Sequence, residues 1–97
     1  MEYKIYDKKK LEDGLLQMSG KDFAEAEKEA RIDGDRSIDI MTSRTFYAAI
    51  AARAFKVRLG DIKEVSLKEY AVITGDVGSF LLEQETEKKE LPNSLEK

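Results

Sequence analysis

The 97-residue sequence contains no cysteine and no histidine, and these two absences exclude many kinds of chemistry. Without cysteine there is no disulfide, no thiol nucleophile and no thiolate metal site. Without histidine the chain lacks the commonest general acid–base residue and the commonest transition-metal ligand. An enzyme built from it would have to work with carboxylates, lysines, tyrosines and hydroxyls alone. We therefore predict that the protein is not an enzyme and that it holds no metal or cofactor.

The sequence also lacks long apolar runs and a large excess of either charge. No stretch approaches the ~18 apolar residues that a membrane-spanning helix needs, and the N-terminus has no apolar core of a signal peptide. With 17 basic and 20 acidic residues the formal net charge is −3. This balance disfavours a dedicated nucleic-acid binder and a polybasic membrane binder. We expect a cytoplasmic protein of one small domain.

Most of the large apolar residues beyond the N-terminus lie in two segments, residues 42–55 and 66–82. Both segments have the spacing of amphipathic helices, in which residues three or four apart share a face. Ser66 followed by Glu69 forms a capping box, the signature of a helix start. Two rows of the first helix fall four residues apart on one broad face: Phe46, Ile50 and Ala54, and Tyr47, Ala51 and Phe55. We predict that the other segments pack against this helix pair.

A third helix is predicted over residues 20–32. Ser19 is a plausible N-cap with Asp22 three residues on, and Gly34 can take the left-handed conformation that ends a helix. Residues 37–41 are predicted to form either an extended link or the first turn of the next helix, which Thr42 or Ser43 would otherwise cap. Asp61 is predicted to cap a short helical turn that ends near residue 65.

Residues 1–18 are predicted to form a β-hairpin. Tyr3 and Ile5 alternate with Lys4 and Tyr6, as in a short strand, and Asp13-Gly14 is a turn signal. A lone hairpin is marginal in water, so it would have to lie on the helices or on another subunit. A helical turn over residues 11–18 is the alternative interpretation.

The sequence therefore predicts a mainly α (α+β) fold. Residues 1–82 would form a single compact domain of three or four helices with the short N-terminal hairpin. Residues 83–97 are highly charged and contain the only proline, Pro92. We predict that these residues form a largely disordered tail.

Asp33, Asp35, Ser37 and Asp39 alternate like the start of a calcium-binding loop. The EF-hand pattern then needs glycine at its sixth position and glutamate at its twelfth, and here those positions hold Ile38 and Arg44. A helix-terminating acidic turn accounts better for these residues.

The middle of the chain is locally basic and has helix–turn–helix spacing between residues 48 and 70. The basic residues are Arg44, Arg53, Lys56, Arg58 and Lys63. A DNA-binding helix must present positive or amide-bearing side chains to the groove. The predicted outer face of the second helix instead offers Lys68, Glu69, Asp76 and Ser79, which complement phosphate poorly. A small helix–turn–helix-like DNA-binding regulator is thus the alternative function, and nucleic-acid binding is disfavoured.

Small residues in the two central helices allow two interpretations. Gly75 and Gly78 each cost about 1 kcal/mol relative to alanine. They either let another helix approach closely or act as a hinge, or they merely tolerate a bulky neighbour such as Phe46 or Phe55. The alanines of the first helix either mark an oligomer interface or are simply good helix formers, and the second interpretation is favoured. They are Ala48, Ala49, Ala51 and Ala52. Oligomeric state is left open.

The second half of the chain resembles a known family. The first helix of this half ends with Ala51-Ala-Arg-Ala-Phe55, and the link after it ends with Asp61-Ile-Lys-Glu-Val65. The last helix starts with Ser66-Leu-Lys-Glu-Tyr70 and ends with Val77-Gly-Ser-Phe-Leu-Leu82. This order resembles the tail assembly chaperones of long-tailed bacteriophages, which often have an Ala-Ala-Arg helix, a Leu-Ser-x-x-Asp-Tyr helix start and a terminal Val-x-x-Phe-Leu. A helix starting at Ser19 after a short β segment also fits. Glu69 stands where an aspartate is common.

The resemblance implies a function and partners. Such chaperones bind the long, helical, aggregation-prone tape measure protein, keep it soluble and recruit tail tube subunits to it. They act in the bacterial cytoplasm and are absent from the mature virion. Many are made in two lengths by ribosomal frameshifting, and here the charged segment after Leu82 would vary.

We place the partner-binding surface in a groove between the two central helices. A small helical domain with a thin core can complete its burial on an amphipathic helix laid in such a groove. The residues predicted to line it are Phe46, Ile50, Val77 and Leu81.

Overall fold

One helix, α3 (Arg44–Phe55), lies at the centre of the fold and packs against α1, α2, α4 and α5. The computed structural model describes the backbone of residues 3–95 and the side chains of residues 3–84. Eight of the twelve residues of α3 are buried, and five of these are alanines. The sequence predicted one broad apolar face, but burial extends around most of the helix because alanine lets neighbouring helices approach closely. These alanines thus contact the chain's own helices.

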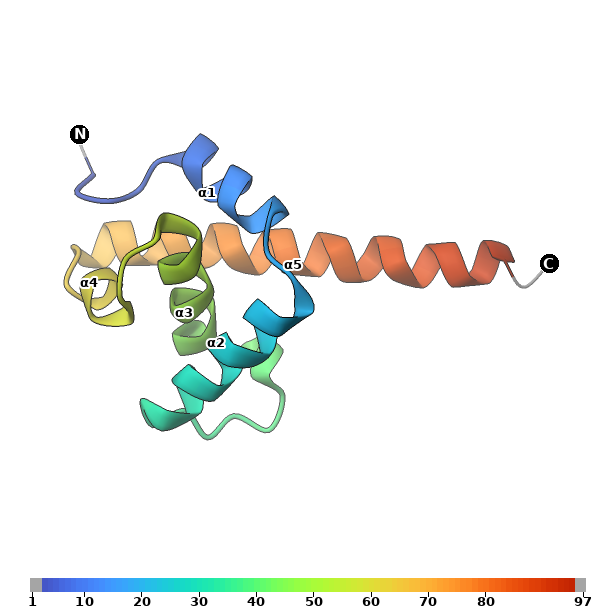
Figure 1. The fold of residues 1–97 in the computed structure, drawn as a ribbon, viewed down its shortest axis with the longest axis horizontal. Coiled ribbons are helices and arrows are strands. Elements are labelled where there is room, and N and C mark those ends of the chain that lie inside the picture. Colours follow the sequence, from blue (N-terminus) through green and yellow to red (C-terminus); the bar gives the residue numbers. More distant parts are fainter. Residues whose placement is uncertain (1–2, 96–97) are drawn as a thin grey trace.

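The other elements are arranged around α3 (Figure 1). They are α1 (Lys8–Leu16), α2 (Gly20–Ile32), the 3-10 turn η1 (Ile40–Thr42), α4 (Leu59–Lys63) and α5 (Leu67–Leu95). α2 spans the residues predicted for it, and Ser19 and Asp22 form a reciprocal capping box at its start. The side chain of Ser43 caps α3 by accepting the Phe46 N–H at 3.0 Å. The structure continues α5 through residues 83–95, where the sequence predicted a disordered tail, and residues 96 and 97 lie outside the described chain.

The predicted N-terminal β-hairpin is wrong, because residues 3–95 contain no strand and residues 8–16 form α1. The Asp7 side chain caps this helix by accepting the Lys10 N–H at 3.1 Å. Leu11 and Leu15, four residues apart, are buried in the core that α3 organises. The pattern that resembled a returning strand is therefore the buried stripe of a short helix.

Gly14 lies inside α1 and not in a turn. An added Cβ there would come within 2.6 Å of the Ala54 carbonyl oxygen in α3, so a larger residue would collide with backbone. The glycine allows the two helices to lie close together. The dipeptide Asp13-Gly14 therefore has the sequence of a turn but lies within a helix.

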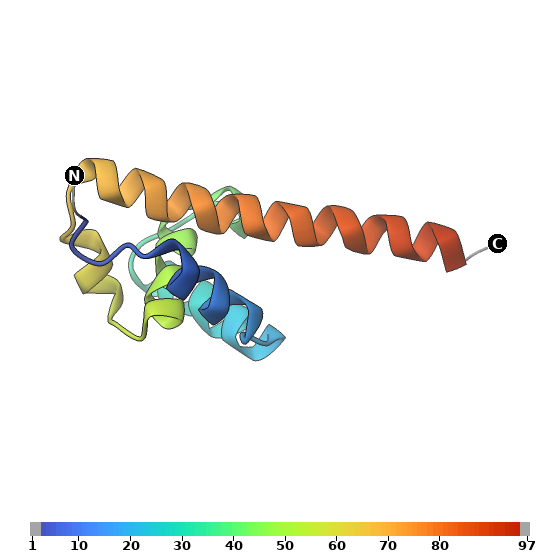
Figure 2. The same cartoon turned by 90° about the horizontal axis from the view of Figure 1, so that it is seen from above.

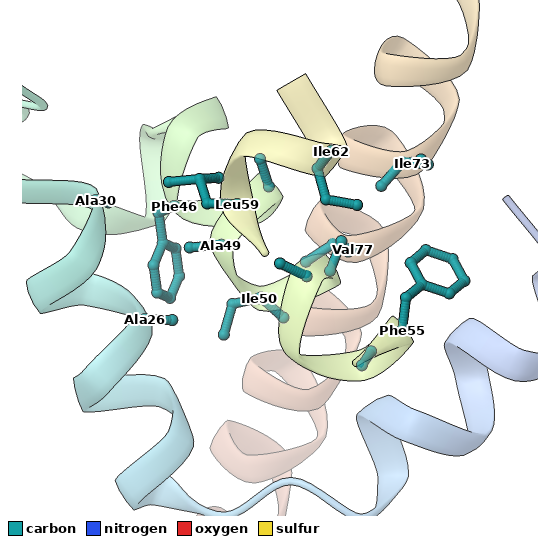
Figure 3. Packing of buried hydrophobic residues seen from close by; sticks show 14 of the residues in the cluster. Ala26, Ala30, Phe46, Ala49, Ile50, Phe55, Leu59, Ile62, Ile73 and Val77 are labelled. Carbon is teal, nitrogen blue, oxygen red and sulfur yellow. The ribbon is translucent and has the colours of Figure 1, made fainter. Parts of the chain in front are cut away.

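The core gathers side chains from every helix around α3 (Figure 3). The ring of Phe46 meets Phe23 of α2 edge-on, with the ring centroids 4.8 Å apart. Ile73 and Val77 of α5 are fully buried on the other side. A Cβ at Gly78 would lie 3.0 Å from the Tyr47 ring, so this glycine accommodates a bulky neighbour, although not Phe46 or Phe55 as predicted.

The extended residues 3–7 reach the first turns of α5 and bond to its side chains. The Glu69 carboxylate is 2% exposed and accepts the backbone N–H groups of Lys4, Ile5 and Tyr6 at 2.9, 2.6 and 2.9 Å. Half of the predicted capping box is present, since the Ser66 hydroxyl accepts the Glu69 N–H at 3.1 Å. Glu69 is therefore a buried anchor and does not lie on the outer face of α5.

Candidate functional site

A groove with an apolar floor runs between α1 and α5, and we call it the α1–α5 groove. Both helices pack on α3, and the space between them holds two adjoining hollows of about 230 and 190 Å³. Leu15 and Phe80 line both hollows, so the hollows are two parts of one feature. The remaining lining residues are Lys8, Leu11, Glu12, Leu16, Met18, Ser19, Phe23, Ile50, Asp76, Ser79, Leu81, Glu83 and Gln84.

α1 has nine residues, and the much longer α5 passes it and runs on beyond the rest of the fold (Figure 2). On α1, Leu15 is buried, while the next residue, Leu16, points outward and is 70% exposed. On α5, Val77 is buried, Phe80 and Leu81 are half-buried, and Leu82 is 52% exposed. Leu16, which lines the larger hollow, is thus a large apolar side chain that the core does not cover, whereas Leu82 is exposed outside both hollows.

The rim of the groove is mostly acidic. Glu12, Asp76 and Glu83 line it, and Lys8 is its single basic residue. Asp76 accepts a hydrogen bond from the Tyr6 hydroxyl, and burial together with this carboxylate raises the pKa of Tyr6. Tyr6 therefore stays neutral at physiological pH and acts as a hydrogen-bond donor at this edge of the groove.

The four predicted partner-binding residues lie in different environments. Phe46 and Val77 are fully buried in the core, where α3 and α5 pack directly on each other. Ile50 is 3% exposed and lies at the floor of the larger hollow, which the half-buried Leu81 also lines. Of the four, therefore, only Ile50 and Leu81 line a hollow, and Ile50 is itself buried.

The sequence analysis missed Leu16, Phe23 and Phe80 as surface-lining residues. The exposure of Leu16 could have been predicted from the sequence, because two adjacent leucines on a helix point about 100° apart and cannot both face one core. Phe80 gave no comparable signal, since its exposure depends on where α1 ends relative to α5.

Several basic residues behind the helix–turn–helix alternative have partners within the molecule. Arg53 pairs with Asp22 and Glu25 at 3.3 and 3.0 Å. Lys63 pairs with Asp33 at 2.7 Å, and this hydrogen bond raises the pKa of Lys63. Arg44 donates to the buried hydroxyl of Thr74. These contacts provide no support for a DNA-binding surface.

The acidic turn after α2 has structural contacts. Asp35 accepts bonds from Arg31 at 3.1 Å and from the Ser37 hydroxyl at 2.9 Å. Burial would raise the pKa of Asp35, but the bonds from Ser37 outweigh it and the pKa is lowered. Asp39 caps η1 by accepting the Met41 N–H. Within the described part of the chain, no group of three or more acidic side chains could hold a metal ion.

Comparisons with protein-family models, with curated proteins and with solved structures found no match to this chain. Among the described residues, no helix is both long enough and apolar enough to cross a membrane. What the structure itself defines is a helical domain with an apolar groove and an acidic rim.

Proposed function

We propose that this protein is a phage tail assembly chaperone that binds a helical segment of the tape measure protein in the α1–α5 groove. In this role it keeps the tape measure protein soluble and helps to recruit tail tube subunits. The observation that carries the proposal is the uncovered apolar surface at the groove, where Leu16 is 70% exposed and lines the larger hollow together with the half-buried Phe80 and Leu81.

The size of the hollows favours a polypeptide over a small ligand. Small-molecule sites are typically about 300–1,000 Å³ and enclose most of the ligand. The two hollows measure about 230 and 190 Å³, and each lies below that range. Apolar side chains on one face of a helix would fill them, as in other helix-in-groove complexes.

The sequence segments that carry the family resemblance support the same surface. The Ala-Ala-Arg segment belongs to α3, the central support of the fold. The segment Ser66–Tyr70 begins α5 and anchors the N-terminal residues through Glu69. In the closing Phe80-Leu81-Leu82, Phe80 and Leu81 line the groove.

Co-expression with the tape measure protein tests the proposal. Leu16→Glu should reduce the soluble fraction of that protein severalfold, because it puts a charge on the exposed apolar wall. Leu67→Glu is the matched control, since Leu67 is 83% exposed and lies at the other end of the body. This control should solubilise its partner as well as the wild type does.

Circular dichroism and thermal unfolding should show that both variants remain folded. If folded Leu16→Glu solubilises the tape measure protein as well as Leu67→Glu does, the groove is not the binding surface. If the wild-type protein neither solubilises nor co-purifies with it, the chaperone function is wrong. A gel shift with the purified chain then tests the DNA-binding alternative.

A further inference from the structure

The chemistry of the groove specifies the kind of segment that it binds. We infer that the α1–α5 groove selects a short amphipathic helix whose apolar stripe is flanked by lysine or arginine. This inference rests on the proposed function and adds a requirement for charge to it. It depends on three features of the groove, which are its length, the distribution of its charges and the absence of a suitable segment elsewhere in this chain.

The walls of the groove limit the length of the occupant. α1 has nine residues, and the lining residues of α5 run from Asp76 to Gln84, also nine. At about 1.5 Å per residue each wall is roughly 13 Å long, or about two and a half helical turns. An occupying helix can therefore place about three apolar side chains, at i, i+3 or i+4, and i+7, over Leu15, Phe80 and Leu81.

The charged lining residues all belong to the smaller hollow, and they lie on both sides of it. Glu12 lies on the α1 side, and Asp76 and Glu83 lie on the α5 side, so that an occupant has carboxylates on both flanks. Lys8, at the N-terminal end of α1, offsets only one of them. A basic flank would be attracted to this rim, whereas an acidic flank would meet like charge. Because the rim is exposed, salt should weaken the preference.

Neither this chain's C-terminal segment nor a second copy matches these requirements. Residues 85–97 contain four glutamates and three lysines, so this segment has no excess of positive charge. Outside the groove lining, the exposed large apolar residues of the described chain are Ile32, Ile38, Leu67 and Leu82. Ile32 ends α2, Ile38 lies in the loop before η1, and Leu67 and Leu82 are fifteen residues apart on α5, so these residues form no stripe. The occupant is therefore a segment of another protein.

Three synthetic 14-residue peptides test the inference by fluorescence anisotropy with the full chain. The first has leucines at i, i+4 and i+7 with lysines flanking the stripe, and the second replaces those lysines with glutamates. The third is a scrambled form of the first, without a stripe. The first should bind about tenfold tighter than the second at low salt, with a smaller ratio at 0.15 M salt, and the third should bind weakly.

Charge reversal in the protein locates the effect. The double variant Glu12→Lys with Glu83→Lys should invert the preference and bind the glutamate-flanked peptide more tightly. The matched control is Glu29→Lys with Glu64→Lys, which makes the same change in net charge beside the distant α2 and α4. This control should keep the preference for the lysine-flanked peptide.

The inference is overturned if the two striped peptides bind equally, if the scrambled peptide binds as well as the first, or if both double variants alter the preference alike. Sedimentation that shows a dimer dissociated by Leu16→Glu would assign the groove to a second copy and also overturn it. Loss of charge selectivity while the wild type still solubilises the tape measure protein would leave the proposed function standing. The two failures are thus distinguishable.

Discussion

The Glu69 carboxylate fixes the N-terminal segment to α5. Its oxygens accept three backbone N–H groups, and the side chain is almost fully buried. Burial alone would raise the pKa of this carboxyl, but the N–H donors of Ile5, Lys4 and Tyr6 outweigh it and the pKa is lowered. The charged form is therefore stabilised in the folded state.

Replacing this carboxylate should destabilise the fold. In Glu69→Gln the side-chain amide would put an NH2 group against N–H donors and remove the charge, so we expect a loss of about 1–3 kcal/mol in the free energy of unfolding. Urea denaturation measures the loss. Glu64→Gln, on an exposed side chain, should change the same quantity by less than about 0.5 kcal/mol. Equal effects of both substitutions would show that Glu69 is not an anchor.

The same carboxylate makes stability depend on pH. Because the folded-state pKa lies below the ordinary value of 4.5, the contribution of Glu69 is complete above that pH and is lost as the pH falls through the folded-state pKa. The difference in unfolding free energy between the wild type and Glu69→Gln should therefore shrink below about pH 4.5. Urea titrations at a series of pH values measure it, and a constant difference down to pH 2.5 would contradict the assignment.

At the scale of elements, the contact between α1 and α3 holds one wall of the groove in place. Gly14 lies against Ala54, and Leu11 and Leu15 fill the space beside it. The orientation of α1 therefore depends on a glycine that allows two helix backbones to approach each other. A change at this contact would move Leu16 and alter the groove.

Gly14→Ala should displace α1 and cost about 1–3 kcal/mol in the free energy of unfolding, because its Cβ would come within 2.6 Å of the Ala54 oxygen. Gly75→Ala is the matched control in α5. Nothing lies within 4 Å of a Cβ at Gly75, so this change should stabilise the protein by about 0.5–1 kcal/mol through helix propensity. Thermal unfolding of the two variants should shift in opposite directions, and a shared direction would contradict the predicted packing.

At the scale of the molecule, the structure consists of a helical body and one long helix that runs beyond it (Figures 1 and 2). The overall extents are 48 × 30 × 20 Å. Among the described side chains, the buried apolar residues lie between Leu11 and Val77. The body, with the groove at its edge, is therefore built almost entirely from the first 84 residues.

Deletion of residues 85–97 should leave the free energy of unfolding within about 0.5 kcal/mol of the full-length value, since every buried apolar residue among the described side chains remains. Peptide binding in the groove should also persist, because the lining residues end at Gln84. Urea denaturation and anisotropy measure both quantities. A truncated chain that is markedly less stable would show that the end of α5 contributes to the fold.

Local sequence determined where three of the helices begin. Ser19, Ser43 and Ser66 each mark a helix start because a hydroxyl satisfies an N–H group that the helix itself leaves unpaired. The absence of cysteine and histidine removed thiolate and imidazole chemistry whatever the fold. These conclusions needed no tertiary structure, since they depend on neighbouring residues or on composition alone.

Tertiary contacts determined the rest. The alternation of Tyr3 and Ile5 marks an extended segment, but its partner is the carboxylate of Glu69 and not a second strand. Gly14 resembles a turn residue until α3 is placed against it. Likewise, Phe46 and Phe80 are both aromatic residues on apolar helices, yet the first is buried and the second lines the groove. Sequence periodicity gives each helix an apolar face, but which part of that face is covered depends on where the other helices end.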